Sequence, residues 1–212
     1  GGIPVAYEVA EALGLPLDVI IVRKLGVPFQ PELAMGAIGE DEARILNDDV
    51  ISSSGIGPGD IALVEKRQHT ELERRVEMLR GTRPRIPLTG RTALIIDDGI
   101  ATGSSVRAAC QVARAQGARQ VIVAAPVAPP HTVDRLRDDA DEVVCVSTPT
   151  PFWAIGQFYD DFTQTSDQEV AELLKKAAEH RAVAVPGQRK PPQRDPLLEH
   201  AAEEAEGIEF FA

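Results

Sequence analysis

The sequence predicts an α/β fold with a mostly parallel sheet and helices on both faces. Short apolar, β-branched runs alternate along the chain with helical patterns, which is typical of consecutive βαβ units. The clearest run, residues 93–96, has no polar residue, as expected for a strand buried on both faces. It ends at two adjacent acids, Asp97 and Asp98, and such sheets bind ligands at the carboxyl ends of their strands.

The first half of the chain predicts a helix directly after Gly1-Gly2 and a long, charged surface or lid helix further on. Between them lie a β-branched strand and weaker strand patterns that would pair with each other at one edge. The predicted elements are, in order, a helix ending at Gly14, a strand over 18–23, a loop over 25–32, strands over 33–38 and 43–46, a flexible connector over 52–60 ending at Asp60 as N-cap, and a helix over 61–80.

The second half continues the alternation. Its predicted elements are a strand over 93–96, a helix with Val106, Ala109, Cys110 and Ala113 on its apolar face, a strand over 120–125, a helix over 132–139, a strand over 142–146 and a helix over 167–180. Residues 181–212 contain four prolines and a cluster of acids. We therefore expect one domain over residues 1–180 and a disordered tail over 181–212, with a short helix near 197–206.

Composition excludes several classes of partner. The 212 residues carry a formal net charge of −11, which disfavours a general nucleic-acid or anionic-membrane surface. No apolar run approaches the roughly 20 residues that span a bilayer, and the start does not resemble a signal peptide. The two cysteines lie in apolar patterns, so we expect a reduced, cytoplasmic protein. Because nucleic-acid and membrane surfaces are disfavoured, we expect it to act on small molecules.

The segment after the run at 93–96 has the properties of a sugar-phosphate site. Its Gly- and hydroxyl-rich loop, residues 99–105, leads into a helix, and unpaired N–H groups at a helix N-terminus attract phosphate. Asp97 and Asp98 would repel a phosphate, but they suit sugar hydroxyls or magnesium beside it. The alternative is a strand end followed by an ordinary helix cap.

This segment closely resembles the signature of type I phosphoribosyltransferases, in which four apolar residues, two acids and a Thr-Gly loop follow one another. Gly1-Gly2 resembles the second half of that family's pyrophosphate loop, although the preceding strand and its basic residue are missing from the sequence. Arg23-Lys24 matches a pyrophosphate-contacting position, and the aromatic stretch 152–160 is similar to the base-binding segment of hypoxanthine-guanine phosphoribosyltransferases. The whole pattern looks most like bacterial phosphoribosyltransferases of unassigned acceptor, and the family's fold adds a small hood or lid to the sheet.

The resemblance implies a role for each matching residue. Asp97, Asp98 and Lys24 would form the catalytic group, and the two aspartates would bind the ribose 2- and 3-hydroxyls. The ribose 5-phosphate site would comprise Asp97, Asp98, Gly99, Ala101, Thr102, Gly103, Ser104 and Ser105. The pyrophosphate site would comprise Gly1, Gly2, Arg23 and Lys24, and the base pocket Phe152, Trp153, Tyr159 and Asp160.

The activity implied is transfer of 5-phosphoribosyl from phosphoribosyl pyrophosphate to a nitrogenous base, with a purine-like base favoured. Mg²⁺ would be the cofactor, held mainly by the substrate and indirectly by Asp97 and Asp98. A non-catalytic sensor of this metabolite and a hydrolase of it remain alternatives, and a homodimer is compatible with the sequence. Because the first strand is missing, we expect weak or no catalysis from the chain as it begins here.

Overall fold

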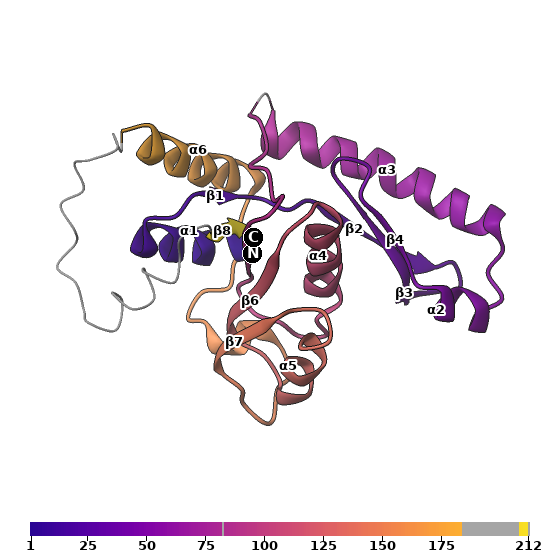
Figure 1. The fold of residues 1–212 in the computed structure, drawn as a ribbon. Helices are drawn as coiled ribbons and strands as arrows, with labels where there is room; N and C mark the ends of the chain where they lie inside the picture. The colour runs from indigo at the N-terminus through magenta and orange to yellow at the C-terminus, as the bar shows by residue number, and fades with distance from the viewer. Residues whose placement is uncertain (82, 184–207, 212) are drawn as a thin grey trace.

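The computed structural model describes residues 1–81, 83–183 and 208–211, which form a five-stranded parallel sheet and a smaller antiparallel sheet (Figure 1). The parallel sheet has the order β1-β8-β5-β6-β7. Its strands are β1 (Leu17–Asp18), β8 (Ile208–Phe211), β5 (Thr92–Ile96), β6 (Gln120–Val127) and β7 (Glu142–Ser147). The antiparallel sheet contains β2 (Val22–Val27), β3 (Gln30–Gly39) and β4 (Arg44–Leu46).

Helices lie on both faces of the parallel sheet, which confirms the predicted fold class. All five residues of β5 are buried, and they alternate between two apolar cores. Ala93 and Ile95 belong to the core under α4 (Ser104–Ala115) and α5 (Pro130–Leu136), whereas Leu94 and Ile96 belong to the core with α1 (Gly2–Leu13) and α6 (Asp167–Val183). This two-sided burial explains why residues 93–96 of the strand are all apolar.

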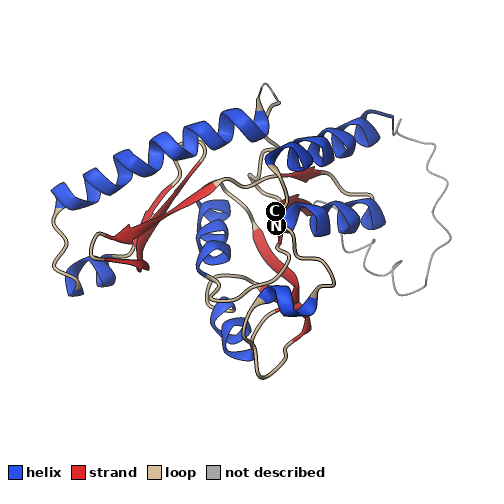
Figure 2. Cartoon of the chain, turned by 180° about the vertical axis from the view of Figure 1, so that it is seen from behind, coloured by secondary structure: helices blue, strands red, loops and turns tan. Residues whose placement is uncertain are grey.

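The small sheet forms a hood, defined here as residues 22–80, that projects to one side of the parallel sheet (Figure 2). The short helix α2 (Asp48–Ser53) and the long helix α3 (Pro58–Arg80) complete it. The α3 helix runs along the three strands and returns the chain to the parallel sheet (Figure 1). The hood is therefore an insertion between β1 and β5, and it corresponds to the hood or lid expected from the sequence.

The predicted strand over 18–23 and the predicted loop over 25–32 were both wrong in detail. The β-branched run divides between the two sheets, with β1 ending at Asp18 and β2 beginning at Val22. The Gly/Pro segment is a hairpin whose strands pair across a bulge near Gly26. A Cβ on Gly26 would lie 2.4 Å from the Pro31 carbonyl oxygen, so the strands approach too closely for a side chain there. The turn residues therefore permit the pairing that they were expected to prevent.

The predicted connector over 52–60 is also largely helical. Helix α2 begins after Asn47, whose side chain accepts a hydrogen bond from the Val50 N–H at 3.1 Å. Helix α3 begins at Pro58, two residues before the expected cap. Asp60 accepts a hydrogen bond from the Gly57 N–H at 3.2 Å, so it lies inside the first turn and closes it from there.

The expected disordered tail is wrong at its last described residues. Strand β8 lies between β1 and β5 and pairs in parallel with both of them. Helix α6 continues to Val183, three residues beyond the predicted end of the domain. The predicted helix near 197–206 lies outside the described residues.

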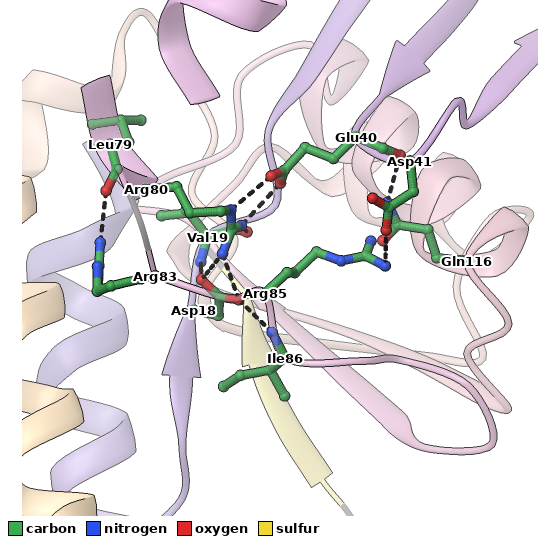
Figure 3. A network of polar contacts seen from close by, with 10 residues as sticks. All are labelled: Asp18, Val19, Glu40, Asp41, Leu79, Arg80, Arg83, Arg85, Ile86 and Gln116. Atoms are coloured by element: carbon green, nitrogen blue, oxygen red, sulfur yellow. Dashed lines mark hydrogen bonds and ion pairs between the residues drawn. The ribbon is translucent and has the colours of Figure 1, made fainter. Parts of the chain in front are cut away.

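A buried ion network joins the hood to the parallel sheet (Figure 3). Arg80, at the end of α3, donates to both oxygens of Asp18 in β1, at 2.8 and 2.9 Å, and to Glu40 at 2.6 and 2.9 Å. The side chains of these three residues are only 7–9% exposed. Burial lowers the pKa of Arg80, but hydrogen bonds and charge from Glu40 and Asp18 outweigh it and raise the pKa overall. The Asp18 carboxylate also accepts from the Ile86 N–H at 2.9 Å.

We predict that Arg80→Met lowers the free energy of unfolding by about 3–5 kcal/mol, because it leaves two buried carboxylates without their cation. Arg74→Met is the matched control on the same helix, because Arg74 is exposed and forms its ion pair with Glu71 at the surface. It should change stability by less than about 0.5 kcal/mol. Urea unfolding of the three proteins tests this. Equal stability of the two variants would contradict the role given to Arg80.

Candidate functional site

The acidic pair lies at the carboxyl end of β5, directly against the start of the chain. The Asp98 N–H donates to Asp97 Oδ1 at 3.0 Å, and both side chains are half-buried. A Cβ on Gly1 would lie 1.8 Å from Asp98 Oδ2, and one on Gly2 would lie 2.7 Å from the Ile96 carbonyl oxygen. A side chain at Gly2 would collide with the main chain at the end of β5, so glycine allows this close approach, and the structure brings together the two predicted halves of the site.

Asp98 and burial together change the ionisation of Asp97. Burial and the neighbouring charge of Asp98 raise the pKa of Asp97 from 3.8 to about 7. The pair therefore holds a proton in conditions where an isolated aspartate would be fully ionised. A ligand that supplies hydroxyl donors or a cation would favour the doubly ionised pair.

The loop after the acidic pair presents unpaired backbone donors. Gly103 has a φ of 76° and forms the N-cap of α4, so the loop turns sharply into the helix. The Thr102 hydroxyl donates to Ser104 Oγ at 3.2 Å, and the Ser104 N–H bonds back to Thr102 Oγ1 at 3.4 Å. The remaining N–H groups make no hydrogen bond to the described part of the chain; they belong to Gly99, Ala101, Thr102, Gly103 and Ser105. This arrangement suits an anion.

A basic cleft of about 820 Å³ lies on the hood side of Asp97. The predicted residues Arg23 and Lys24 line it, and each has one polar partner: Arg23 Nε donates to Gln68 Oε1 at 2.9 Å, and Lys24 Nζ lies 3.3 Å from Glu32. Gly1 and Gly2 lie at its other wall. The predicted pyrophosphate residues therefore all border one cleft.

Two further cations, Arg67 and Arg75 on α3, also line the basic cleft, and the sequence analysis missed them. Both are exposed, and they lie about two helical turns apart, so they project from the same side of α3. Their spacing is readable in the sequence, but many other charges share that helix. Only the packing of the hood selects the face that meets the acidic pair.

A second cleft, of about 690 Å³, adjoins Asp98 on the side away from the hood strands. Tyr159 and Phe162 line it, with their ring centroids 5.2 Å apart. We call it the aromatic cleft. It is bordered by polar residues of the segment before α6 and of α6 itself, including Asp161, Gln164, Glu169, Glu172 and Lys176.

The predicted base pocket is only partly assembled. Of its four residues, only Tyr159 lines either the basic cleft or the aromatic cleft. Phe152 packs against Phe158, with their ring centroids 5.4 Å apart. Trp153 is 82% exposed, and Asp160 is also exposed. Phe162, which the sequence analysis left out of the pocket, lies beside Tyr159 instead. The aromatic spacing could not reveal this, because the 3₁₀ turn η1 (Ile155–Phe158) sets which rings face the acidic pair.

The described residues contain no preformed metal cage. No group of three or more His, Cys, Asp or Glu side chains among them could hold a metal ion. Two adjacent carboxylates beside a polyanion site fit Mg²⁺, which commonly binds one or two carboxylates together with substrate phosphates. No helix in this part of the chain is long and apolar enough to cross a membrane.

The described chain is thus an α/β domain with a hood, in which an acidic pair and a loop with free N–H groups stand at the carboxyl edge of a parallel sheet. The phosphoribosyl transferase domain family matches residues 1–163, and the chain belongs to that family. This confirms the resemblance seen in the sequence. The match includes the acidic pair, the loop, the hood and the aromatic segment.

Two relatives and one solved structure agree with this assignment. The chain is 56% identical over 199 residues to the Mycobacterium tuberculosis proteins named "Putative phosphoribosyl transferase Rv0571c" and "Putative phosphoribosyl transferase MT0597". These matches cover 92% of the chain but only 44% of each relative, so the chain spans less than half of their length. The crystal structure of TT1426 from Thermus thermophilus superposes with a TM-score of 0.77 at 40% identity, covering 82% of each chain.

We predict that Asp97→Asn stabilises the protein more at pH 8 than at pH 5. A raised folded-state pKa means that the folded protein retains a proton that the unfolded chain has lost, so Asp97 costs stability progressively between about pH 4 and pH 7. Asn removes this cost, and we expect its gain in Tm to be several degrees larger at pH 8 than at pH 5.

Asp138→Asn, at an exposed position after α5, is the control and should shift Tm equally at both pH values. Thermal unfolding in matched buffers measures both variants. A gain for Asp97→Asn that does not grow with pH would contradict the raised pKa.

Proposed function

We propose that this domain transfers 5-phosphoribosyl from phosphoribosyl pyrophosphate to a nitrogenous base and releases pyrophosphate. The observation that carries the proposal is the position of Asp97 and Asp98. They stand between a basic cleft and an aromatic cleft and directly precede an anion-binding loop. A sugar that bears a phosphate at one end and a pyrophosphate at the other would complement this arrangement, with its hydroxyls at the acidic pair, its phosphate at the loop and its pyrophosphate in the basic cleft.

The donor's sugar and 5-phosphate would occupy the acidic pair and the loop. Ionised carboxylates accept hydrogen bonds from the 2- and 3-hydroxyls of ribose, which are donors. The 5-phosphate would lie at the free N–H groups of residues 99–105 and at the positive end of the α4 dipole. The hydroxyls of Thr102, Ser104 and Ser105 are close enough in sequence to add donors.

The donor's pyrophosphate would occupy the basic cleft. Arg23, Lys24, Arg67 and Arg75 supply positive charge there, and Gly1 and Gly2 also line the cleft. When bound, Mg²⁺ would neutralise charge on the pyrophosphate, and Asp97 and Asp98 would support it from the protein. The chain's own cations would stabilise the negative charge that develops as the anomeric C–O bond breaks.

The acceptor would enter from the aromatic cleft. A nucleophile that inverts the anomeric carbon attacks from the face opposite the leaving group, and this cleft lies across the acidic pair from the basic one. Tyr159 and Phe162 provide ring surface for a planar base, which favours a purine-like acceptor. Catalysis would then depend on positioning and charge, with no nucleophile from the protein.

We predict that the full chain releases pyrophosphate from magnesium phosphoribosyl pyrophosphate when a suitable base is present. A panel of purines, pyrimidines and pyridine carboxylates, with a coupled pyrophosphate assay, identifies the acceptor. Asp98→Asn should lower kcat/KM by about 100-fold or more, as expected when charge stabilisation at the reacting centre is lost. Asp138→Asn is again the control.

The alternatives give different results in the same assay. Pyrophosphate release without any acceptor would indicate a hydrolase. Saturable binding without release for every base would indicate a sensor. Either result would contradict the transferase proposal, and so would full activity of Asp98→Asn.

We predict that Arg75→Ser weakens binding of phosphoribosyl pyrophosphate by about 10-fold, the effect of losing about 1.4 kcal/mol, and leaves binding of ribose 5-phosphate unchanged. Arg74→Ser is the matched control, because Arg74 neighbours Arg75 on α3 but does not line the basic cleft. Isothermal titration calorimetry with both ligands tests this. Equal loss for both ligands would contradict a pyrophosphate role for Arg75.

A further inference from the structure

Two side-chain hydroxyl groups from distant parts of the chain donate hydrogen bonds to carbonyl oxygens in the segment that contains the acidic pair and the loop after it. The Tyr159 hydroxyl donates to the Asp98 carbonyl oxygen at 2.5 Å, and the Thr132 hydroxyl donates to the Ala101 carbonyl oxygen at 2.7 Å. Thr132 belongs to α5 and is only 2% exposed, whereas Tyr159 follows η1. Both hydroxyls therefore act on main-chain atoms of the loop that begins with the acidic pair.

We propose that Tyr159 and Thr132 are positioning residues that aim backbone N–H groups of the loop at the 5-phosphate. In a trans peptide the C=O and the following N–H point in opposite directions. Holding the Asp98 carbonyl on one side turns the Gly99 N–H to the other, and holding the Ala101 carbonyl does the same for the Thr102 N–H. This inference rests on the proposed function, because it takes the 5-phosphate of ribose as the ligand.

The packing of the same two segments supports this role. A Cβ on Gly99 would lie 2.5 Å from Ile155 in η1, and one on Gly103 would lie 3.1 Å from the Thr132 methyl group. Helix α5 and the segment that contains η1 and Tyr159 thus each pack closely against one glycine of the loop, and each donates one hydrogen bond to a nearby carbonyl oxygen. Neither the Gly99 nor the Thr102 N–H bonds to another described residue; Thr102 is exposed, and Gly99 is buried under the segment that contains Ile155.

The Tyr159 hydroxyl remains a donor under ordinary conditions. Burial, followed by the charges of Asp98 and Asp97, raises the pKa of Tyr159 above its usual value of 10.0. A protonated phenol donates to the carbonyl and adds no negative charge beside the phosphate. The same ring lines the aromatic cleft, so one side chain contacts the loop and borders the proposed acceptor site.

The test removes each hydroxyl and keeps the shape of the side chain, with Thr132→Val and Tyr159→Phe in the full chain. We expect each to weaken binding of ribose 5-phosphate and to raise the KM for phosphoribosyl pyrophosphate about 3- to 10-fold, with kcat nearly unchanged. Binding of pyrophosphate alone should not change. Thr132→Ser, which retains the hydroxyl, should bind ribose 5-phosphate like the wild type.

Matched controls separate positioning from stability. Thr92→Val removes the hydroxyl of a threonine that is 3% exposed and bonds to Gln120, and Tyr7→Phe removes a phenol on α1; neither should change ribose 5-phosphate binding. Wild-type affinity in Thr132→Val and Tyr159→Phe would overturn the inference, and so would equal weakening by Thr132→Ser. If the wild type itself binds pyrophosphate but not ribose 5-phosphate, the proposed function fails as well.

Discussion

The contact of Arg80 with Asp18 and Glu40 is the constraint on which the site depends. One guanidinium at the end of α3 joins β1 of the parallel sheet to Glu40, which follows β3 in the hood. These are the elements that carry the cations and lead to the acidic pair. Buried ion pairs are costly to desolvate, and a well-packed apolar group would satisfy stability alone. The geometry of a guanidinium with two carboxylates instead specifies where the hood lies (Figure 3).

With the hood held there, the acidic pair separates two environments of different chemistry. Cations from β2 and α3 face Asp97, and aromatic rings face Asp98. Burial and the nearby charge of Asp98 disfavour the ionised form of Asp97 and raise its pKa. A ligand with hydroxyl donors at its centre and negative charge on one side would favour the ionised form. This arrangement of charge supports the proposal that the site binds a phosphorylated sugar.

The sequence predicted the parts of the site that are local in the chain. The apolar strand, the acidic pair, the Gly/hydroxyl loop and its helix follow each other directly, and the alternation of elements predicted the sheet. The hood hairpin was missed because Gly26 and Pro31 are turn residues that here permit a close strand pairing. Arg67, Phe162 and Thr132 were missed for another reason: packing between distant segments brings them to the site, and no pattern near them records it.

A crystal structure of the full chain with Mg²⁺ and phosphoribosyl pyrophosphate tests the central claim most directly. The account predicts ribose hydroxyls within hydrogen-bond distance of Asp97 and Asp98. It also predicts the 5-phosphate at the N–H groups of residues 99–105 and the pyrophosphate between Gly2 and Arg75. A donor bound in the opposite direction, or bound away from the acidic pair, would contradict the account.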